Sequence, residues 1–157
     1  MSYTLKTNVH GACACGVAQF AFIAPPLSIV NCHCEECRKA SGAAFTTWVT
    51  VERSTVLQLP DRHLLVMRVR ETGIRYRCEV CGTHVYSADQ FDKQFIGFPM
   101  GVIRRGLESA VVQANYCVEQ RVAWFSPHDD LPNVANSVDF DPYVPNEPGR
   151  ERHNHET

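Results

Sequence analysis

The chain lacks any long hydrophobic run, since none of its apolar stretches approaches the about 20 residues that a membrane-spanning helix needs. It also lacks a strong excess of charge, because its formal net charge is -2 over 157 residues. Proteins that bind nucleic acid usually present a basic face, which supplies most of the affinity. These two absences predict a protein that neither spans a membrane nor binds nucleic acid.

A secretory signal is a further absence. The first residues, Met1-Ser2-Tyr3-Thr4-Leu5-Lys6, do not contain the apolar segment of a signal peptide. We therefore expect a cytoplasmic protein in a reducing compartment, where disulfide bonds are rare. The eight cysteines are then expected to bind metal or to carry thiol chemistry instead of forming a disulfide framework.

No long amphipathic helix is evident, and most of the periodicity is short and two-fold. Apolar residues that alternate between turn signals are typical of β-strands, and a helical turn is expected only at Glu35–Ala40. A loop is expected at Gly101–Gly106. The sequence predicts a mainly β domain of short antiparallel strands. The candidate strands are Ala18–Phe22, Phe45–Val51, Val56–Leu59, Leu64–Val69, Ile74–Cys78, Val85–Tyr86, Phe95–Phe98 and Ala110–Val118.

The composition changes near residue 136. From there the chain is polar and contains Pro142, Pro145 and Pro148, as well as two histidines, His153 and His155. Such a segment is expected to pack poorly, and histidines in it are expected to be solvated. We therefore predict a zinc-binding domain over residues 1–135 and a polar, proline-containing C-terminal tail over residues 136–157.

Seven of the eight cysteines lie in three tight clusters, and Cys117 stands alone in an apolar stretch, where we expect a buried free thiol. Two cysteines separated by two residues can direct both thiolates at one zinc ion, about 2.3 Å from each sulfur. A glycine follows two of the clusters and allows a tight turn with positive φ. The clusters are Cys13-Ala14-Cys15-Gly16, Cys32-His33-Cys34-Glu35-Glu36-Cys37 and Cys78-Glu79-Val80-Cys81-Gly82.

The third cluster resembles a zinc knuckle, which supplies two ligands and needs two more. Cys13 and Cys15 are natural partners for Cys78 and Cys81, because their pair is also incomplete. Four thiolates would close a structural zinc site, and the metal affinity would contribute to folding. Spacing alone leaves a second pairing open, in which Cys78 and Cys81 join the Cys32–Cys37 cluster.

Under the first pairing, Cys32, Cys34 and Cys37 form an incomplete tetrahedron. Its fourth position can take water, a substrate thiol or a further protein ligand, which is the arrangement of catalytic zinc. His33 lies between two of these ligands, and we expect it to support them or to face solvent. The alternative is that all of these cysteines are structural, in one or two closed zinc sites without chemistry.

A longer pattern of motifs carries a family resemblance over roughly Tyr3 to Pro132. This pattern resembles the family of glutathione-dependent formaldehyde-activating enzymes and centromere protein V. The motifs are Gly11-Ala12-Cys13-Ala14-Cys15-Gly16, Cys32-His33-Cys34-Glu35-Glu36-Cys37-Arg38-Lys39-Ala40-Ser41-Gly42, Cys78-Glu79-Val80-Cys81-Gly82-Thr83, Trp124-Phe125 and Asp130-Leu131-Pro132.

The resemblance implies a fold of the β-tent type and two zinc ions per chain. It implies that Cys13, Cys15, Cys78 and Cys81 hold a structural zinc, and that Cys32, Cys34 and Cys37 hold a zinc assigned to catalysis. The implied activity is that of a carbon–sulfur lyase, an S-(hydroxymethyl)glutathione synthase that condenses formaldehyde with glutathione. Another small thiol or a related carbonyl would suit the same chemistry.

Two features qualify the resemblance. Family members often carry a Gly-Ser-Leu-Asp-like turn where this chain has Gly97–Val102, which leaves the specificity for glutathione open. Arg104 and Arg105 could meet a carboxylate of glutathione, but we expect them in a solvated loop. Two hypotheses remain, a zinc-dependent lyase that acts on small thiol adducts and a non-catalytic zinc-binding module used for partner binding.

Overall fold

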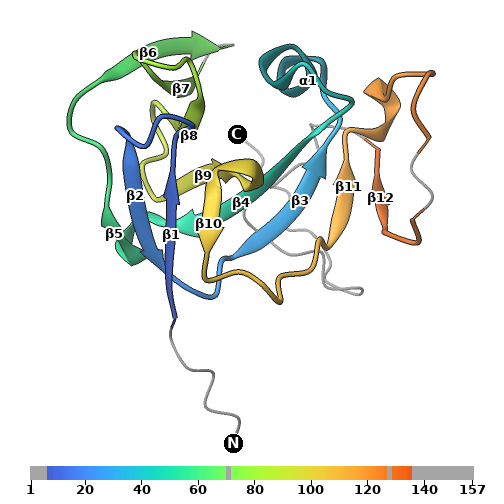
Figure 1. The fold of residues 1–157 in the computed structure, drawn as a ribbon. Helices are drawn as coiled ribbons and strands as arrows, with labels where there is room; N and C mark the ends of the chain where they lie inside the picture. Colours follow the sequence, from blue (N-terminus) through green and yellow to red (C-terminus); the bar gives the residue numbers. More distant parts are fainter. Residues whose placement is uncertain (1–6, 70–71, 127–128, 136–157) are drawn as a thin grey trace, which may run out of the picture.

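The computed structural model describes residues 7–69, 72–126 and 129–135, and these residues form a mainly β structure with short helical segments (Figure 1). The strands are β1 (Asn8–Ala12), β2 (Gln19–Ile23), β3 (Ser28–Cys32), β4 (Thr46–Glu52), β5 (Val56–Gln58), β6 (Leu64–Val69), β7 (Gly73–Cys78), β8 (His84–Asp89), β9 (Phe95–Pro99), β10 (Ile103–Arg105), β11 (Ala114–Tyr116) and β12 (Asn133–Val134). The helical segments are α1 (Glu35–Ser41) and the 3-10 turns η1 (Arg53–Thr55), η2 (Met100–Val102) and η3 (Val118–Gln120).

The strands form two sheets. One is four-stranded with the order β10-β1-β2-β5, and the other is eight-stranded with the order β12-β11-β3-β4-β9-β8-β7-β6. Neighbouring strands are antiparallel, as the short turns predict, except that β11 runs parallel to both β3 and β12. Within the described residues, none of the helical segments has the length and apolar character to cross a bilayer.

The predicted mainly β fold is confirmed, and the differences lie at the level of single elements. Strands β1, β3 and β12 have no counterpart among the expected strands, and the loop expected at Gly101–Gly106 contains β10 and part of η2. The expected strand over Ala110–Val118 is reduced to β11. Before β11, Gln113 exchanges hydrogen bonds with the backbone of Ile29 in β3, and after β11 Cys117 leaves the extended conformation. The tail predicted over residues 136–157 lies outside the described residues.

The hydrophobic core lies between the two sheets, and the two-residue period of the strands decides which side chains enter it. On β4, Val49 and Val51 belong to the core, while Trp48 and Thr50 point to the opposite face of the eight-stranded sheet. The eight-stranded sheet is therefore covered by the four-stranded sheet on one face, and its other face is free to build a site.

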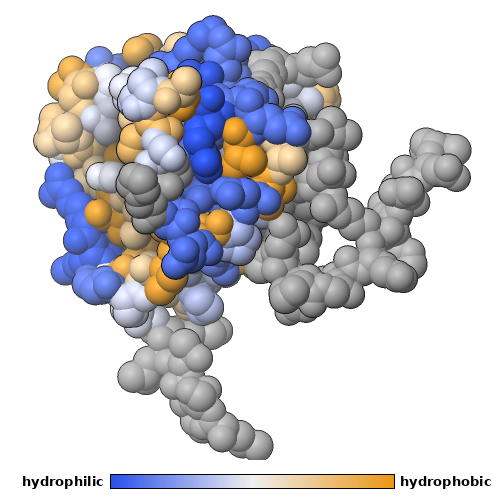
Figure 2. Space-filling view, turned by 90° about the vertical axis from the view of Figure 1, so that its right-hand side faces the viewer, coloured by the Kyte–Doolittle hydropathy of each residue, from blue (hydrophilic) through white to orange (hydrophobic). Residues whose placement is uncertain are grey.

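One side of the molecule has a surface of mixed polarity. Figure 2 views the molecule from the side where β11 and β12 lie in Figure 1, and hydrophilic and hydrophobic residues are interspersed on it. Three consecutive apolar side chains of the edge strand β6, Leu65, Val66 and Met67, are also exposed.

The close approach of β1 to the core depends on one glycine. Gly11 pairs with Phe20 of β2, and a Cβ atom added at Gly11 would lie 2.0 Å from Phe20 Cζ. The Phe20 ring cannot retreat, because it is buried and stacks on Phe98 with ring centroids 4.2 Å apart. Only glycine therefore fits between this ring and the strand.

We expect Gly11→Ala to lower the free energy of unfolding by about 1–3 kcal/mol, because the added methyl group overpacks the core. Urea denaturation at equilibrium measures the change. Gly101→Ala is the matched control, because a Cβ atom at Gly101 meets no heavy atom within 4 Å. Equal stability of the two variants would contradict the assigned role of Gly11.

Candidate metal centres

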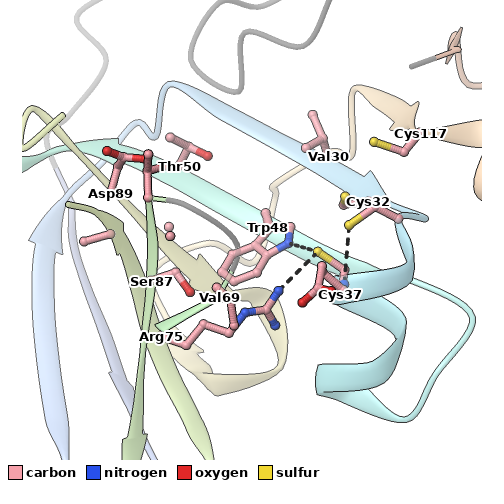
Figure 3. Close-up of a pocket in the computed structure, with 16 residues that line it drawn as sticks. Val30, Cys32, Cys37, Trp48, Thr50, Val69, Arg75, Ser87, Asp89 and Cys117 are labelled. Carbon is pink, nitrogen blue, oxygen red and sulfur yellow. Dashed lines mark hydrogen bonds between the residues drawn. The ribbon is translucent and has the colours of Figure 1, made fainter. Parts of the chain in front are cut away.

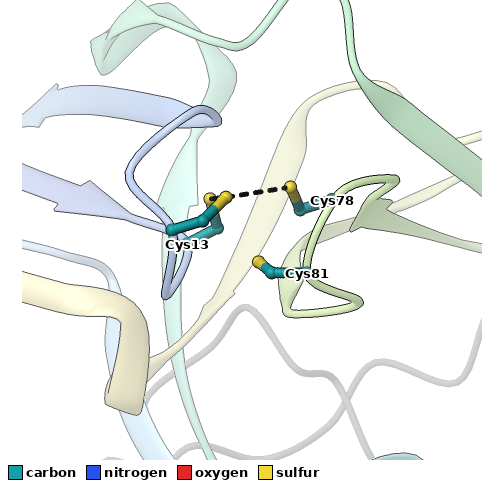
Figure 4. A group of neighbouring side chains, drawn as sticks. Cys13, Cys78 and Cys81 are labelled. Atoms are coloured by element: carbon teal, nitrogen blue, oxygen red, sulfur yellow. Dashed lines mark hydrogen bonds between the residues drawn. The ribbon is translucent and has the colours of Figure 1, made fainter.

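Two hairpin turns from different sheets meet at the first cysteine cluster. Cys13 and Cys15 lie in the turn that connects β1 and β2 of the four-stranded sheet. Cys78 ends β7 and Cys81 lies in the turn before β8, both in the eight-stranded sheet. We call these four residues the four-thiol cluster, and Figure 4 shows their sulfur atoms converging between the two loops.

The sulfur atoms of the four-thiol cluster have the spacing of a metal site. All four lie within 4.8 Å of one another, with Cys13 and Cys15 3.4 Å apart and Cys15 and Cys78 3.8 Å apart. A zinc tetrahedron with bonds of 2.3 Å has sulfur–sulfur edges of about 3.8 Å. The pairing of Cys78 and Cys81 with the Cys32–Cys37 cluster, which spacing left open, is therefore not the one that the structure adopts.

The two turns share a glycine with positive φ, and Thr83 joins them. Gly16 and Gly82 have φ of 82° and 72°, so the positive φ expected after each cysteine pair is confirmed. Thr83 joins the turns, because its hydroxyl accepts a hydrogen bond from Ala14 N at 3.1 Å and lies 3.1 Å from Cys81 Sγ. The bond with Thr83 lowers the pKa of the Cys81 thiol to about 5, which favours the thiolate that a metal binds.

The second cluster is built by a strand end and the helix that follows it. Cys32 is the last residue of β3, Cys34 is the N-cap of α1, and Cys37 lies in the first turn of that helix. Cys34 Sγ accepts a hydrogen bond from Cys37 N at 3.4 Å, which is the usual task of an N-cap side chain. The three sulfur atoms lie within 4.8 Å of one another, and we call these residues the three-thiol cluster.

Two N–H groups from the sheet are directed at Cys37. Trp48 Nε1 donates to Cys37 Sγ at 3.3 Å, and Arg75 Nη2 approaches the same sulfur at 4.0 Å, as Figure 3 shows. Arg75 exposes only 6% of its surface, and its Nη1 has no hydrogen-bond partner among the described residues. N–H donors and a positive charge stabilise a sulfur in its thiolate form.

A cavity of about 280 Å³ opens onto the three-thiol cluster, on the face of the eight-stranded sheet that the core does not use. Cys32, Cys34 and Cys37 form one end of it, and Arg75, Ser87 and Asp89 contribute polar atoms farther along the sheet. Trp48 fits against the sheet because Gly97 has no side chain, since a Cβ atom there would lie 3.1 Å from the ring. Gly97 therefore lines the cavity, and it begins the Gly97–Val102 segment, in which this chain differs from the turn that family members often carry.

Cys117 lies at the same cavity and is the main feature that the sequence did not reveal. It is buried as expected, but it packs in one cluster with Cys32, Cys34 and Cys37 and lines the cavity with them. Its backbone is left-handed, with φ 55° and ψ 42°, a conformation that costs a non-glycine residue about 1–2 kcal/mol. The spacing of cysteines along the chain carries no signal for this contact, because β11 reaches β3 from 84 residues away.

His33 is not exposed, and it belongs to neither the four-thiol nor the three-thiol cluster. It is fully buried, and its Nε2 lies 3.2 Å from Asn115 Oδ1. Burial lowers the pKa of His33, which keeps the ring neutral. Asn115 also accepts from Asn31 at 3.1 Å and donates to Asp129 at 2.9 Å, so this polar network holds β3 against β11 beside the cluster. The role expected for His33 as a support fits this geometry.

Four other polar residues near the two clusters differ in whether they line the cavity. Glu36 lines it, whereas Glu35 forms an exposed ion pair with Lys39 at 2.7 Å. Arg104 and Arg105 are exposed on β10, and Arg104 Nη2 donates to Cys13 O at 3.3 Å, next to the four-thiol cluster. The arginine that faces the cavity is Arg75, which sequence analysis did not select.

Both clusters could hold a metal ion, and their donor atoms are compatible with zinc. Thiolate donors in tetrahedral arrangements favour zinc and other soft metals, and all eight cysteines are free thiols. The four-thiol cluster is complete in itself. The three-thiol cluster is incomplete and faces a cavity, which is the difference between a closed site and one that can exchange a ligand.

Comparisons with known proteins agree with this architecture. The sequence profile of the family described as glutathione-dependent formaldehyde-activating enzyme matches residues 8–119. A crystal structure of a protein from Rhodobacter sphaeroides has a similar fold, with a TM-score of 0.50 and 17% sequence identity. That similarity covers 66% of this chain and 96% of the other chain.

We expect Trp48→Phe to weaken metal binding at the three-thiol cluster by about 10-fold, because the ring remains but the N–H bond to Cys37 is lost. Competition between the protein and a chromophoric chelator for Zn²⁺ measures this affinity. Trp124→Phe is the matched control, because Trp124 is 73% exposed. An unchanged affinity in Trp48→Phe would show that this hydrogen bond does not support the cluster.

Proposed function

The chain belongs to the family of glutathione-dependent formaldehyde-activating enzymes, and from this membership we propose that it is a zinc-dependent carbon–sulfur lyase. The proposed reaction forms or cleaves adducts of glutathione, or another small thiol, with formaldehyde or a related carbonyl. In its best-fitting form the enzyme is S-(hydroxymethyl)glutathione synthase-like. We place this chemistry in the cytoplasm, where eight free thiols remain reduced.

One observation carries the proposal: the cavity opens directly onto the three-thiol cluster. A purely structural metal site has no need of a ligand-sized space beside its open position. We assign two zinc ions to the chain. The structural zinc would be held by Cys13, Cys15, Cys78 and Cys81, and the catalytic-type zinc by Cys32, Cys34 and Cys37.

When bound at the three-thiol cluster, zinc would supply a Lewis acid that keeps a substrate thiol in its nucleophilic thiolate form. The substrate sulfur forms a bond to the carbonyl carbon, and the carbon–oxygen π-bond becomes a hydroxyl group that takes up one proton. The proton lost by the thiol balances the proton gained by the oxygen. Cleavage of the adduct is the reverse of these steps.

The residues of the chain position the reactants for this addition. Trp48 and Arg75 direct N–H groups at Cys37, which fixes its thiolate and offsets negative charge in the cluster. Arg75 lines the same cavity, and its guanidinium suits a carboxylate of the substrate. Glutathione carries two carboxylates, so the charge of Arg75 favours it over a neutral thiol.

We expect the native protein to accelerate the exchange between formaldehyde and its glutathione adduct, and we expect Cys34→Ser to reduce the rate to that of the uncatalysed reaction. Exchange NMR with ¹³C-formaldehyde measures the rate. Elemental analysis of the same samples should show two zinc ions in the native chain and one in the variant. Catalysis at the native rate by a variant that has lost one zinc would refute the proposal.

We expect Arg75→Lys to raise the KM for glutathione by about 10–100-fold, because a charge-assisted hydrogen bond of about 1.5–3 kcal/mol is lost. The KM for 2-mercaptoethanol, which has no carboxylate, should change little. Arg68→Lys is the matched control, because Arg68 lies on the exposed part of β6. Equal increases in KM for both thiols would assign Arg75 to the metal cluster alone.

The alternative, a non-catalytic zinc-binding module used for partner binding, is favoured by the edge strand β6. Leu65, Val66 and Met67 are exposed there, and β6 pairs on one side only with the strands that the structure describes. An apolar edge of this kind is a surface on which another chain can add a strand. A protein that holds both zinc ions but accelerates no thiol–carbonyl exchange would favour this alternative.

A further inference from the structure

We propose that Cys117 is a fourth thiol of the second metal centre, which completes the coordination of the metal at rest and gives way when a substrate thiol binds. The inference rests on the proposal that the three-thiol cluster holds zinc. It gives a role to the cysteine whose isolated position in the sequence suggests none.

The fold delivers Cys117 to the cluster through a parallel strand pair. Tyr116 of β11 lies opposite Cys32 of β3, and His33 N donates to Tyr116 O at 2.9 Å. Asn115 ties the two strands a second time through its bonds to Asn31 and His33. Because β11 is held in this register, the residue after Tyr116 must lie beside the residues that follow Cys32.

The position of Cys117 suits a fourth member of the cluster. Cys117 packs in the same buried cluster as Cys32, Cys34 and Cys37, and it lines the cavity together with all three. Figure 3 shows the Cys117 sulfur on the Cys32 side of the cavity. Cys117 is not among the sulfur atoms that lie within 4.8 Å of one another, so its side chain must move closer to the three-thiol cluster to complete a tetrahedron.

The backbone conformation of Cys117 indicates that its side chain is needed at this position. It has a left-handed backbone and is almost completely buried. Glycine or asparagine is the usual residue in that conformation. A strained residue that persists next to a functional cluster is expected where its side chain is needed there.

Electrostatics fit a fourth thiolate as well. A zinc ion with three thiolates has a net charge of about -1, and a fourth thiolate makes it about -2. Buried negative charge needs a compensating cation, and Arg75 lies against Cys37 with its Nη1 without a partner in the described part of the chain. This guanidinium balances the additional charge that Cys117 brings.

Exchange of Cys117 for a substrate thiol is balanced in charge and protons. The bond from the metal to Cys117 breaks, a bond to the substrate sulfur forms, and the proton of the substrate thiol passes to Cys117. One thiolate replaces another, so the charge of the centre stays constant. Cys117 would then protect the metal from water and chelators in the absence of substrate.

Cobalt substitution tests the proposal without any catalytic assay. The metal-free chain is loaded with Co²⁺ under anaerobic conditions, and the thiolate-to-cobalt charge-transfer absorption per bound cobalt is measured. We expect Cys117→Ser to keep its cobalt and to lose about one eighth of the intensity, because one of the eight cysteines no longer ligates. Added 2-mercaptoethanol should restore the intensity in the variant by supplying the missing thiolate.

Two further variants keep the test decisive. Cys117→Gly removes the sulfur and suits the left-handed backbone, so it replaces Cys117→Ser if the serine variant does not fold. Val30→Ala is the matched control, because Val30 is buried at the same cavity and offers no ligand. Spectra of the Cys117 variants that equal those of the native chain and of Val30→Ala, at equal cobalt content, would overturn the proposal.

The affinity for thiols gives a second readout. Removal of a competing internal ligand should tighten glutathione binding to the cobalt protein by about 10-fold in Cys117→Ser, if the open form is about one tenth of the resting population. Unchanged or weaker binding would count against the exchange. Because both readouts use metal and thiol alone, failure of the lyase assay leaves them interpretable, and their failure leaves the lyase proposal standing.

Discussion

The convergence of four sulfur atoms from two sheets is the constraint on which the rest of the structure depends. The β1–β2 turn and the β7–β8 turn each offer an incomplete pair of thiols, and Thr83 joins the turns because its hydroxyl accepts a hydrogen bond from Ala14 N. Once these turns meet, the two sheets are fixed face to face and the core between them closes. A metal at this point would act as a joint between sheets, and its binding energy would be part of the folding energy.

The eight-stranded sheet then serves two purposes, one on each face. Its inward positions, such as Val49, Val51 and Phe98, pack against the four-stranded sheet. Its outward positions, such as Trp48 and Arg75, face the cavity and the three-thiol cluster. Strand alternation thus separates the stabilising residues from the reactive ones, so the cavity can differ between relatives without disturbing the core.

How much could be predicted from the sequence depended on the range of the interaction. The cysteine pairs, the helical turn after Cys34 and the positive φ of Gly16 and Gly82 are local, and spacing was enough to anticipate them. The family resemblance and the incompleteness of two pairs also gave the meeting of Cys13 and Cys15 with Cys78 and Cys81.

Contacts between elements that are far apart in the sequence left no local pattern from which they could be predicted. Cys117 reaches the three-thiol cluster through a parallel pairing of β11 with β3, which the short antiparallel turns of the chain do not suggest. Arg75 looked like an ordinary charged residue, because its burial follows from the register of β7 and not from its own neighbours in sequence. Strands β1 and β3 were missed because Gly11 and Asn31 interrupt their apolar pattern.

The two clusters differ in how much chain must be ordered before they exist. Cys32, Cys34 and Cys37 lie within one turn of helix and the strand end before it, so they can assemble while most of the chain is still unfolded. The four-thiol cluster closes a loop between Cys15 and Cys78, which are 63 residues apart, and must bear the entropy of that closure. During synthesis, the three-thiol cluster can therefore bind a metal before the four-thiol cluster can form. Cys117 is synthesised later and is the last of these cysteines to reach the three-thiol cluster.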